Sequence, residues 1–267
     1  MRVNVARVWE DSDYARVKNM CESNQGWTEV YKKKCVAVFT QTVPSSNYHM
    51  IKAVATFPDV PTSVAYDVLH DSAYRPHWDR HMAAQCYIGR INPNNDIGYY
   101  ALTGIPPVRA RDFVLQRSWL DTGDEKMICG HSVCHQDYPP MKGYVRGTAL
   151  LSAYLIRPSH RKDGGCDLVY ISHADPKGNI PTWLVNRLTR VVAPKIIKRL
   201  YKACLAYPEW KARNQPNVKP WIYPEQQLDF PRVDLAKCQP QEYDQEIIDE
   251  SMSMKDVDLD EEEEEEE

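Results

Sequence analysis

The sequence predicts an α+β fold dominated by an antiparallel sheet of about nine strands. Segments rich in Val, Ile, Leu, Tyr and Thr recur along the chain with turn sequences between them, which is typical of strands that pair with their neighbours in sequence. One long amphipathic helix follows the last of these segments. The final residues are acidic, and a run of like charges of this kind does not join a core.

The first 70 residues are expected to form a helix, about three strands and a second, short helix. Ser12 is a candidate cap for a helix over residues 11–24, and Pro61 and Thr62 open the short helix. The two clearest strands of this part are residues 36–39 and 50–55, separated by the turn-forming residues 44–47.

Six further strands are expected after Trp78, because each segment is rich in residues that favour a pleated sheet. They are residues 84–91, 97–103, 112–120, 126–135, 145–156 and 167–174. Turn sequences lie between several of them, at residues 92–95, 121–124 and 162–165.

The long helix is expected over residues 182–206, with a kink at Pro194. Its apolar stripe recurs at steps of three and four residues: Leu184, Leu188, Val192, Ile196 or Ile197, Leu200 and Cys204. Basic residues cover much of its remaining surface: Arg187, Arg190, Lys195, Lys198, Arg199 and Lys202. Two interpretations fit this pattern. The helix either packs on the sheet with its basic face in water, or acts as a lid whose apolar face closes a cavity and whose basic face meets an anionic membrane.

Composition favours a cytoplasmic protein. The chain has 267 residues, 43% of them hydrophobic, which is enough for a core. No run of 18 apolar residues is present, and the first ten residues lack the apolar centre of a signal peptide. The eight cysteines are scattered without C-x-x-C pairs, as in a reduced intracellular chain. Arg2 and the terminal glutamates match no lipid-anchor motif.

Charge is divided unevenly along the chain. Residues 242–267 contain 15 acidic residues and one lysine, a charge of −14. The whole chain carries −4, so residues 1–241 carry +10. A basic body is therefore joined to an acidic tail, which is expected to be disordered. Ser253, with Asp256 three residues on, fits the pattern of acidophilic kinases of the casein kinase 2 type.

Several motifs resemble the START family of lipid-transfer domains, and most closely its phosphatidylcholine-transfer branch. They are Tyr74-Arg75-x-x-Trp78-Asp79, Gly98-Tyr99-Tyr100, Arg111-Asp112, Tyr138-Pro139-Pro140, Asp175-Pro176-Lys177-Gly178, Ala193-Pro194-Lys195, and the run from Tyr201 through Lys211 followed by Lys219-Pro220-Trp221. The resemblance covers about residues 15–225. It implies a helix-grip fold, in which a curved antiparallel sheet surrounds a long C-terminal helix and encloses one lipid. We therefore expect a lipid-binding domain over residues 1–225 and a disordered acidic tail over 226–267.

The resemblance also implies ligand-binding residues. The arginine that holds the lipid phosphate falls on Arg75, although an ion pair with Asp79 is the plain structural alternative. Two aromatic positions of the choline cage fall on Tyr100 and Phe113, which could equally be ordinary core residues. The third falls on Leu150, and an amide that assists the phosphate falls on Ser152. These two departures put strict choline selectivity in question. Tyr154, on the same strand face as Leu150, is a possible substitute.

The entrance of the cavity is expected at the apolar loop 104–108, which the resemblance places opposite the C-terminal helix. Ile105 and Val108 would form the gate with that helix, whose basic residues would contact anionic membranes. An ordinary turn is the alternative. We expect a bound phospholipid as cargo, no cofactor, a monomer, and an acidophilic kinase as a possible partner.

Other functions have less support in the sequence. His131, Cys134, His135 and His173 fit no standard zinc spacing, and a Cys134–His173 nucleophile pair lacks a motif. No G-x-S-x-G, Walker A or Rossmann fingerprint is present, and no RNA-binding motif accompanies the basic body. Two alternatives to a carrier stay open: an enzyme on the same fold, and a scaffold whose partner surface is switched by lipid.

Overall fold

The computed structural model describes residues 4–104, 108–160, 164–178, 180–241 and 243, apart from the side chains of residues 182 and 186–190. Nine strands form one antiparallel path in the order β1-β2-β3-β10-β9-β7-β6-β5-β4, and β8 pairs in parallel with β6. The strands are β1 Thr28–Lys33, β2 Val36–Gln41, β3 Met50–Phe57, β4 Met82–Asn92, β5 Asn95–Leu102, β6 Arg111–Asp121, β7 Lys126–Ser132, β8 Val145–Arg146, β9 Thr148–Pro158 and β10 Cys166–Asp175. This confirms the predicted sheet of about nine strands.

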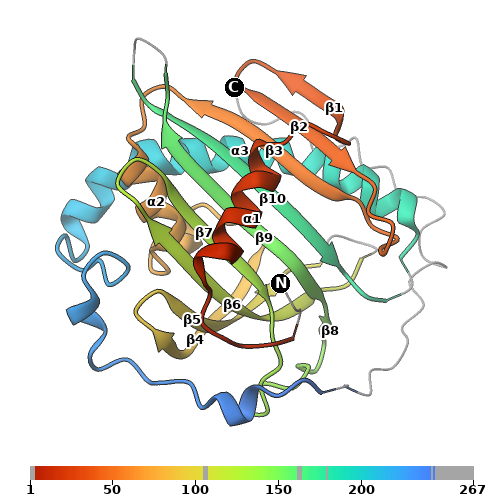
Figure 1. Ribbon diagram of the computed structural model, residues 1–267, viewed down its shortest axis with the longest axis vertical. Coiled ribbons are helices and arrows are strands. Elements are labelled where there is room, and N and C mark those ends of the chain that lie inside the picture. The colour runs from red at the N-terminus through yellow and green to blue at the C-terminus, as the bar shows by residue number, and fades with distance from the viewer. Residues whose placement is uncertain (1–3, 105–107, 161–163, 179, 242, 244–267) are drawn as a thin grey trace.

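Helices lie on both faces of the sheet. Figure 1 shows α1 (Asp11–Glu22) on one face and α3 (Thr182–Arg213) on the other. The short α2 (Thr62–His70) contacts α3 and β9, whereas α1 contacts β9 and β10. Three short 3-10 helices complete the fold: η1 Arg75–His77, η2 Pro224–Gln227 and η3 Leu235–Cys238.

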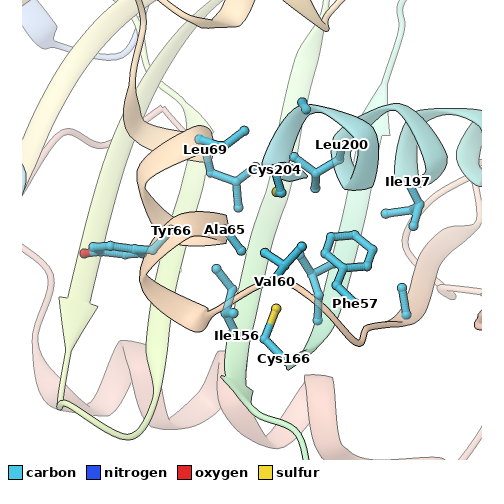
Figure 2. Close-up of a cluster of buried hydrophobic side chains, with 14 of the residues drawn as sticks. Phe57, Val60, Ala65, Tyr66, Leu69, Ile156, Cys166, Ile197, Leu200 and Cys204 are labelled. Atoms are coloured by element: carbon cyan, nitrogen blue, oxygen red, sulfur yellow. The ribbon is translucent and has the colours of Figure 1, made fainter. Parts of the chain in front are cut away.

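The core has two main layers because alternate residues of a strand point to opposite faces. On the α3 side, Phe57, Ile156 and Cys166 of the sheet pack with α2 and α3, as Figure 2 shows. The residues that the helices and the preceding loop contribute are Val60, Ala65, Tyr66, Leu69, Ile197, Leu200 and Cys204. On the α1 side, Ala153 and Leu155 of β9 pack with Tyr14, Val17 and Cys21.

Several element boundaries differ from those predicted. Helix α1 begins after Glu10, not Ser12, because Glu10 and Asp13 form a reciprocal capping box. The expected strand 145–156 divides at Gly147, where β8 ends before β9 begins. The long helix runs seven residues beyond 206, through Pro208. Its end is held because Lys211 Nζ and the Tyr207 hydroxyl both donate to Asp71 Oδ2, at 2.8 and 2.9 Å.

The packed part of the chain also extends beyond residue 225, the predicted end of the domain. Backbone bonds join Arg90 of the edge strand β4 to the C-terminal segment: Arg90 N donates to Pro231 O and Val233 N donates to Arg90 O, each at 2.9 Å. Further along, Gln136 N donates to Lys237 O at 2.8 Å. The segment therefore covers part of an otherwise open sheet edge, which explains why these residues are ordered. Residues 244–267, which hold most of the acidic tail, lie outside the described residues.

Candidate functional site

A cavity of about 620 Å³ lies between the sheet, η1 and α3. Its wall is mostly apolar and aromatic, with a few charged groups. The residues that form it on the sheet side include Asp96, Gly98, Tyr100, Leu115, Arg117, Ile128, Ser152, Tyr154 and Tyr170, and those on the helical side include Leu69, Arg75, Trp78, Asp79, Val192, Ile196 and Arg199. A concave, largely apolar space with convergent polar groups is the usual form of a small-molecule site.

Arg75 lies in this wall and is paired with Asp79. Pro76 lies in the first turn of η1, and the spacing of four residues brings Arg75 Nη1 to 3.1 Å from Asp79 Oδ2. Arg75 Nη2 donates to the carbonyl of Leu69 at 3.3 Å, and the guanidinium lies 4.9 Å from the ring centroid of Trp78. A guanidinium has five N–H groups, so this pairing does not use up its capacity to bind an anion.

Tyr100 completes the polar cluster around Asp79. Its hydroxyl donates to Asp79 Oδ2 at 2.6 Å, and its ring centroid lies 5.9 Å from the Arg75 guanidinium. Burial, and then the Asp79 carboxylate, raise the pKa of Tyr100. The hydroxyl therefore stays protonated and holds Asp79 beside Arg75. An ion pair between these two residues was the structural alternative to phosphate binding. The ion pair is present, and contact with phosphate stays a prediction.

Two tyrosines stack on the neighbouring strands. Tyr154 of β9 lies opposite Tyr170 of β10, with ring centroids 4.5 Å apart and planes inclined by 23°. Both rings lie in the cavity wall. Tyr154 was expected there, whereas Tyr170 was missed. The turn predicted at residues 162–165 indicated a hairpin, but a hairpin centred there would pair position 154 with position 173, whereas the observed register pairs it with 170.

A second ion pair in the wall was also missed by the sequence analysis. Arg117 donates to both oxygens of Asp96, with Nε–Oδ1 and Nη2–Oδ2 distances of 3.0 and 2.6 Å. A third of the Arg117 side chain is accessible, and it faces the cavity. Burial would lower the pKa of Arg117, but the Asp96 carboxylate outweighs this and raises it.

The other residues implied by the resemblance are placed as follows. Ser152 lies in the cavity wall, two residues from Tyr154 on the same face of β9. Phe113 is opposite Tyr100 in the β5–β6 register, so the two share a face, but its ring lies against Gly147. Leu150 shares the face of Ser152 and is half-buried. Neither Phe113 nor Leu150 is among the residues that line the cavity, so their contact with a ligand stays a prediction.

At the expected gate, Val108 packs against the cluster that Ile180 and Leu184 form around the start of α3. This contact joins the loop before β6 to the helix, as the resemblance implied. Ile105, the other expected gate residue, lies outside the described residues. The same applies to the side chains of Arg187 and Arg190.

The basic residues of α3 do not all lie on one surface. Lys198 and Lys202 are exposed, and Lys195 is half-buried. Arg199 was expected to contact a membrane but lines the cavity, because it follows Ile196 by three residues on the same face of the helix. Its Nη1 donates to Nε2 of His81 at 3.3 Å. A guanidinium accepts no hydrogen bond, so His81 Nε2 is unprotonated in this contact.

Among the described residues, no group of three or more His, Cys, Asp or Glu side chains is placed to hold a metal ion. All eight cysteines are free thiols. A search of the described helices finds none with the length and apolar character needed to cross a membrane.

Comparison with known proteins agrees with the motifs. The START domain family pattern matches residues 7–211. Mouse START domain-containing protein 10 is 40% identical over 247 residues, which cover 92% of this chain and 84% of the relative. Bovine phosphatidylcholine transfer protein is 24% identical over 199 residues, which cover 72% of this chain and 91% of the relative.

A solved structure supports the same assignment. The crystal structure of human STARD10 superimposes with a TM-score of 0.83 and 38% sequence identity, and covers 90% of this chain and 98% of that chain. The resemblance drawn from the sequence motifs is therefore confirmed, together with the helix-grip architecture. On its motifs, its fold and these relatives, the chain belongs to the START domain family.

Proposed function

We propose that this START protein binds one glycerophospholipid in its cavity and carries it between membranes. The observation that carries the proposal is Arg75, a directional anion-binding group within a wall that is otherwise mostly apolar and aromatic. Such a wall suits acyl chains, since each buried CH₂ contributes about 0.8 kcal/mol. Relatives named phosphatidylcholine transfer protein and START domain-containing protein 10 are consistent with a lipid carrier.

Phosphatidylcholine is the first candidate for the cargo, and phosphatidylethanolamine is the second. Ring faces at Tyr100 and Tyr154 suit either headgroup. Leu150, which replaces an aromatic residue of the implied choline cage, weakens the case for choline alone. We infer a carrier and not an enzyme, with the lipid as cargo and no cofactor.

Native mass spectrometry of the purified chain tests this proposal. One phospholipid per chain is expected, and sterol or ceramide in its place would contradict the headgroup assignment. Transfer of labelled lipid between vesicles then separates a carrier from the lipid-switched scaffold. A carrier moves lipid between vesicles without a partner, whereas a scaffold changes its protein partners between the loaded and the empty state.

We further propose that the protein is cytoplasmic and monomeric and binds membranes transiently through the gate and the exposed lysines of α3. Lys198 and Lys202 are suitably exposed. The acidic tail would compete with anionic lipid for these charges. Phosphorylation of Ser253 by an acidophilic kinase would add about −1.5 to −2 charge to the tail and so strengthen the competition.

A further inference from the structure

The hydroxyl groups of Tyr154 and Tyr170 differ from those of several other tyrosines of the fold. The hydroxyls of Tyr14, Tyr74, Tyr100, Tyr201 and Tyr207 donate to protein acceptors, whereas that of Tyr66 is unpaired but enclosed in the core. Those of Tyr154 and Tyr170 have no hydrogen-bond partner among the described residues, yet they are not sealed from the cavity. Both residues are half-buried and line the cavity, so their hydroxyl groups can pair with a polar group of a ligand there.

These hydroxyls share the cavity with the proposed phosphate site. Arg75, Asp79 and Tyr100 line the same space as the stacked pair. Burial, with Tyr170 as the next contribution, raises the pKa of Tyr154 well above its ordinary value, and the Arg75 guanidinium acts in the opposite direction. Tyr154 therefore stays neutral at physiological pH, and a neutral phenol both donates and accepts hydrogen bonds.

The two headgroups considered for the cargo differ in the interactions that they can make with such a wall. A quaternary ammonium has no N–H group, so it interacts with the ring faces alone. A primary ammonium has three N–H groups, each of which needs an acceptor once water is excluded. Ring faces therefore serve both headgroups, whereas phenol oxygens serve only the primary ammonium.

We propose that Tyr170, together with Tyr154, selects the headgroup by accepting hydrogen bonds from a primary ammonium. Arg75 holds the phosphate, and the two phenol oxygens receive the amine that the ethanolamine linker places nearby. This inference rests on the proposed phospholipid carrier and adds a preference to it. It assigns to β10 a recognition residue at a position that none of the implied cage residues occupies.

The test uses the full chain and removes the hydroxyls while keeping the rings. Wild type, Y154F, Y170F and the double variant are equilibrated with vesicles that contain equal amounts of phosphatidylethanolamine and phosphatidylcholine with the same acyl chains. Native mass spectrometry gives the ratio of the two lipids bound. A hydrogen bond to a charged group contributes about 1.5 kcal/mol or more, so the double variant is expected to lower the ethanolamine-to-choline ratio about tenfold.

Two further variants serve as controls for the position of the hydroxyl and for the ring. Y201F removes a hydroxyl that donates to Asp59, away from the cavity wall, and should leave the ratio unchanged. Y170L removes the ring as well and should lower the loading of both lipids. Thermal unfolding of Y154F and Y170F should match wild type, because their hydroxyls have no partner among the described residues.

The outcomes separate this inference from the proposed function. An unchanged ratio in the double variant, with both lipids still bound, overturns the inference and leaves the carrier intact. An equal loss of both lipids in Y170F also overturns it, because the hydroxyl would then serve the phosphate. A wild-type chain that binds no phospholipid overturns the proposed function itself.

Discussion

Replacement of Arg75 by alanine should separate ligand binding from folding. In the empty protein the substitution removes the 3.1 Å bond to Asp79 and the 3.3 Å bond to the Leu69 carbonyl. Asp79, with 12% of its side chain exposed, retains the hydrogen bond from Tyr100. Because Asp79 keeps this partner and some access to water, we expect R75A to cost about 1–2 kcal/mol of stability. That corresponds to a fall in Tm of about 2–8 °C for a domain of this size.

Loading with phospholipid should fall much further. A guanidinium that binds phosphate makes charge-assisted hydrogen bonds, and each contributes about 1.5–3 kcal/mol. Loss of one such bond lowers affinity about 10- to 100-fold. The assay is the amount of phospholipid per folded chain after exposure to vesicles, measured by native mass spectrometry. Thermal unfolding of delipidated protein gives the stability in parallel.

Lysine at the same position provides the matched control. R75K keeps the positive charge but cannot present two parallel N–H groups, so loading should be intermediate between wild type and R75A. If Arg75 serves only to bridge Asp79, the pattern reverses. Stability would then fall in R75A while the loading of each folded molecule stays normal, and the assignment of Arg75 to phosphate would be refuted.

Three more predictions concern the gate, the tail and pH. A disulfide engineered as V108C/L184C should block lipid exchange when oxidised, because these residues pack together at the gate, and unchanged exchange would show that lipid enters elsewhere. Deletion of residues 242–267 should increase binding to anionic vesicles at low salt, with less difference at high salt, and equal binding by both forms would exclude competition by the tail. Burial, and next the two nearby arginines, hold the pKa of His70 well below its ordinary value, so unfolding takes up a proton and stability falls as pH drops below about 6.5. The loss is about 1.4 kcal/mol by pH 5.5, and H70F, which retains a ring against its aromatic neighbours, should show a shallower pH dependence of Tm; equal slopes would contradict this.

The sequence supported the sheet, the long helix and part of the site for identifiable reasons. Strand and turn composition is a local property, so β2, β3 and the turn between them were predictable from their own residues. Arg75 and Asp79 are four residues apart, and Tyr154 and Ser152 two apart, so short spacing was enough to place each pair.

What the sequence did not predict depends on contacts between distant segments. The pairing of Arg117 with Asp96 requires the β5–β6 register, in which the two residues are opposite each other. The inward position of Arg199 depends on how α3 is rotated against the sheet, and a basic residue beside an apolar stripe is compatible with either side. The ordered C-terminal segment was missed because its sequence has little apolar periodicity. Backbone bonds to β4 hold it in place, and such bonds leave no pattern in the side chains.

That segment bears on where the folding unit ends. The family pattern stops at residue 211, but Lys219 Nζ donates to Asp67 at 2.6 Å and Trp221 stacks on His70 at 5.6 Å. A chain cut at 211 would leave the buried carboxylate of Asp67 without these donors and expose the β4 backbone at Arg90. Such a fragment should aggregate through its open strand. The unit that folds is therefore longer here than residues 7–211, by which the family is recognised.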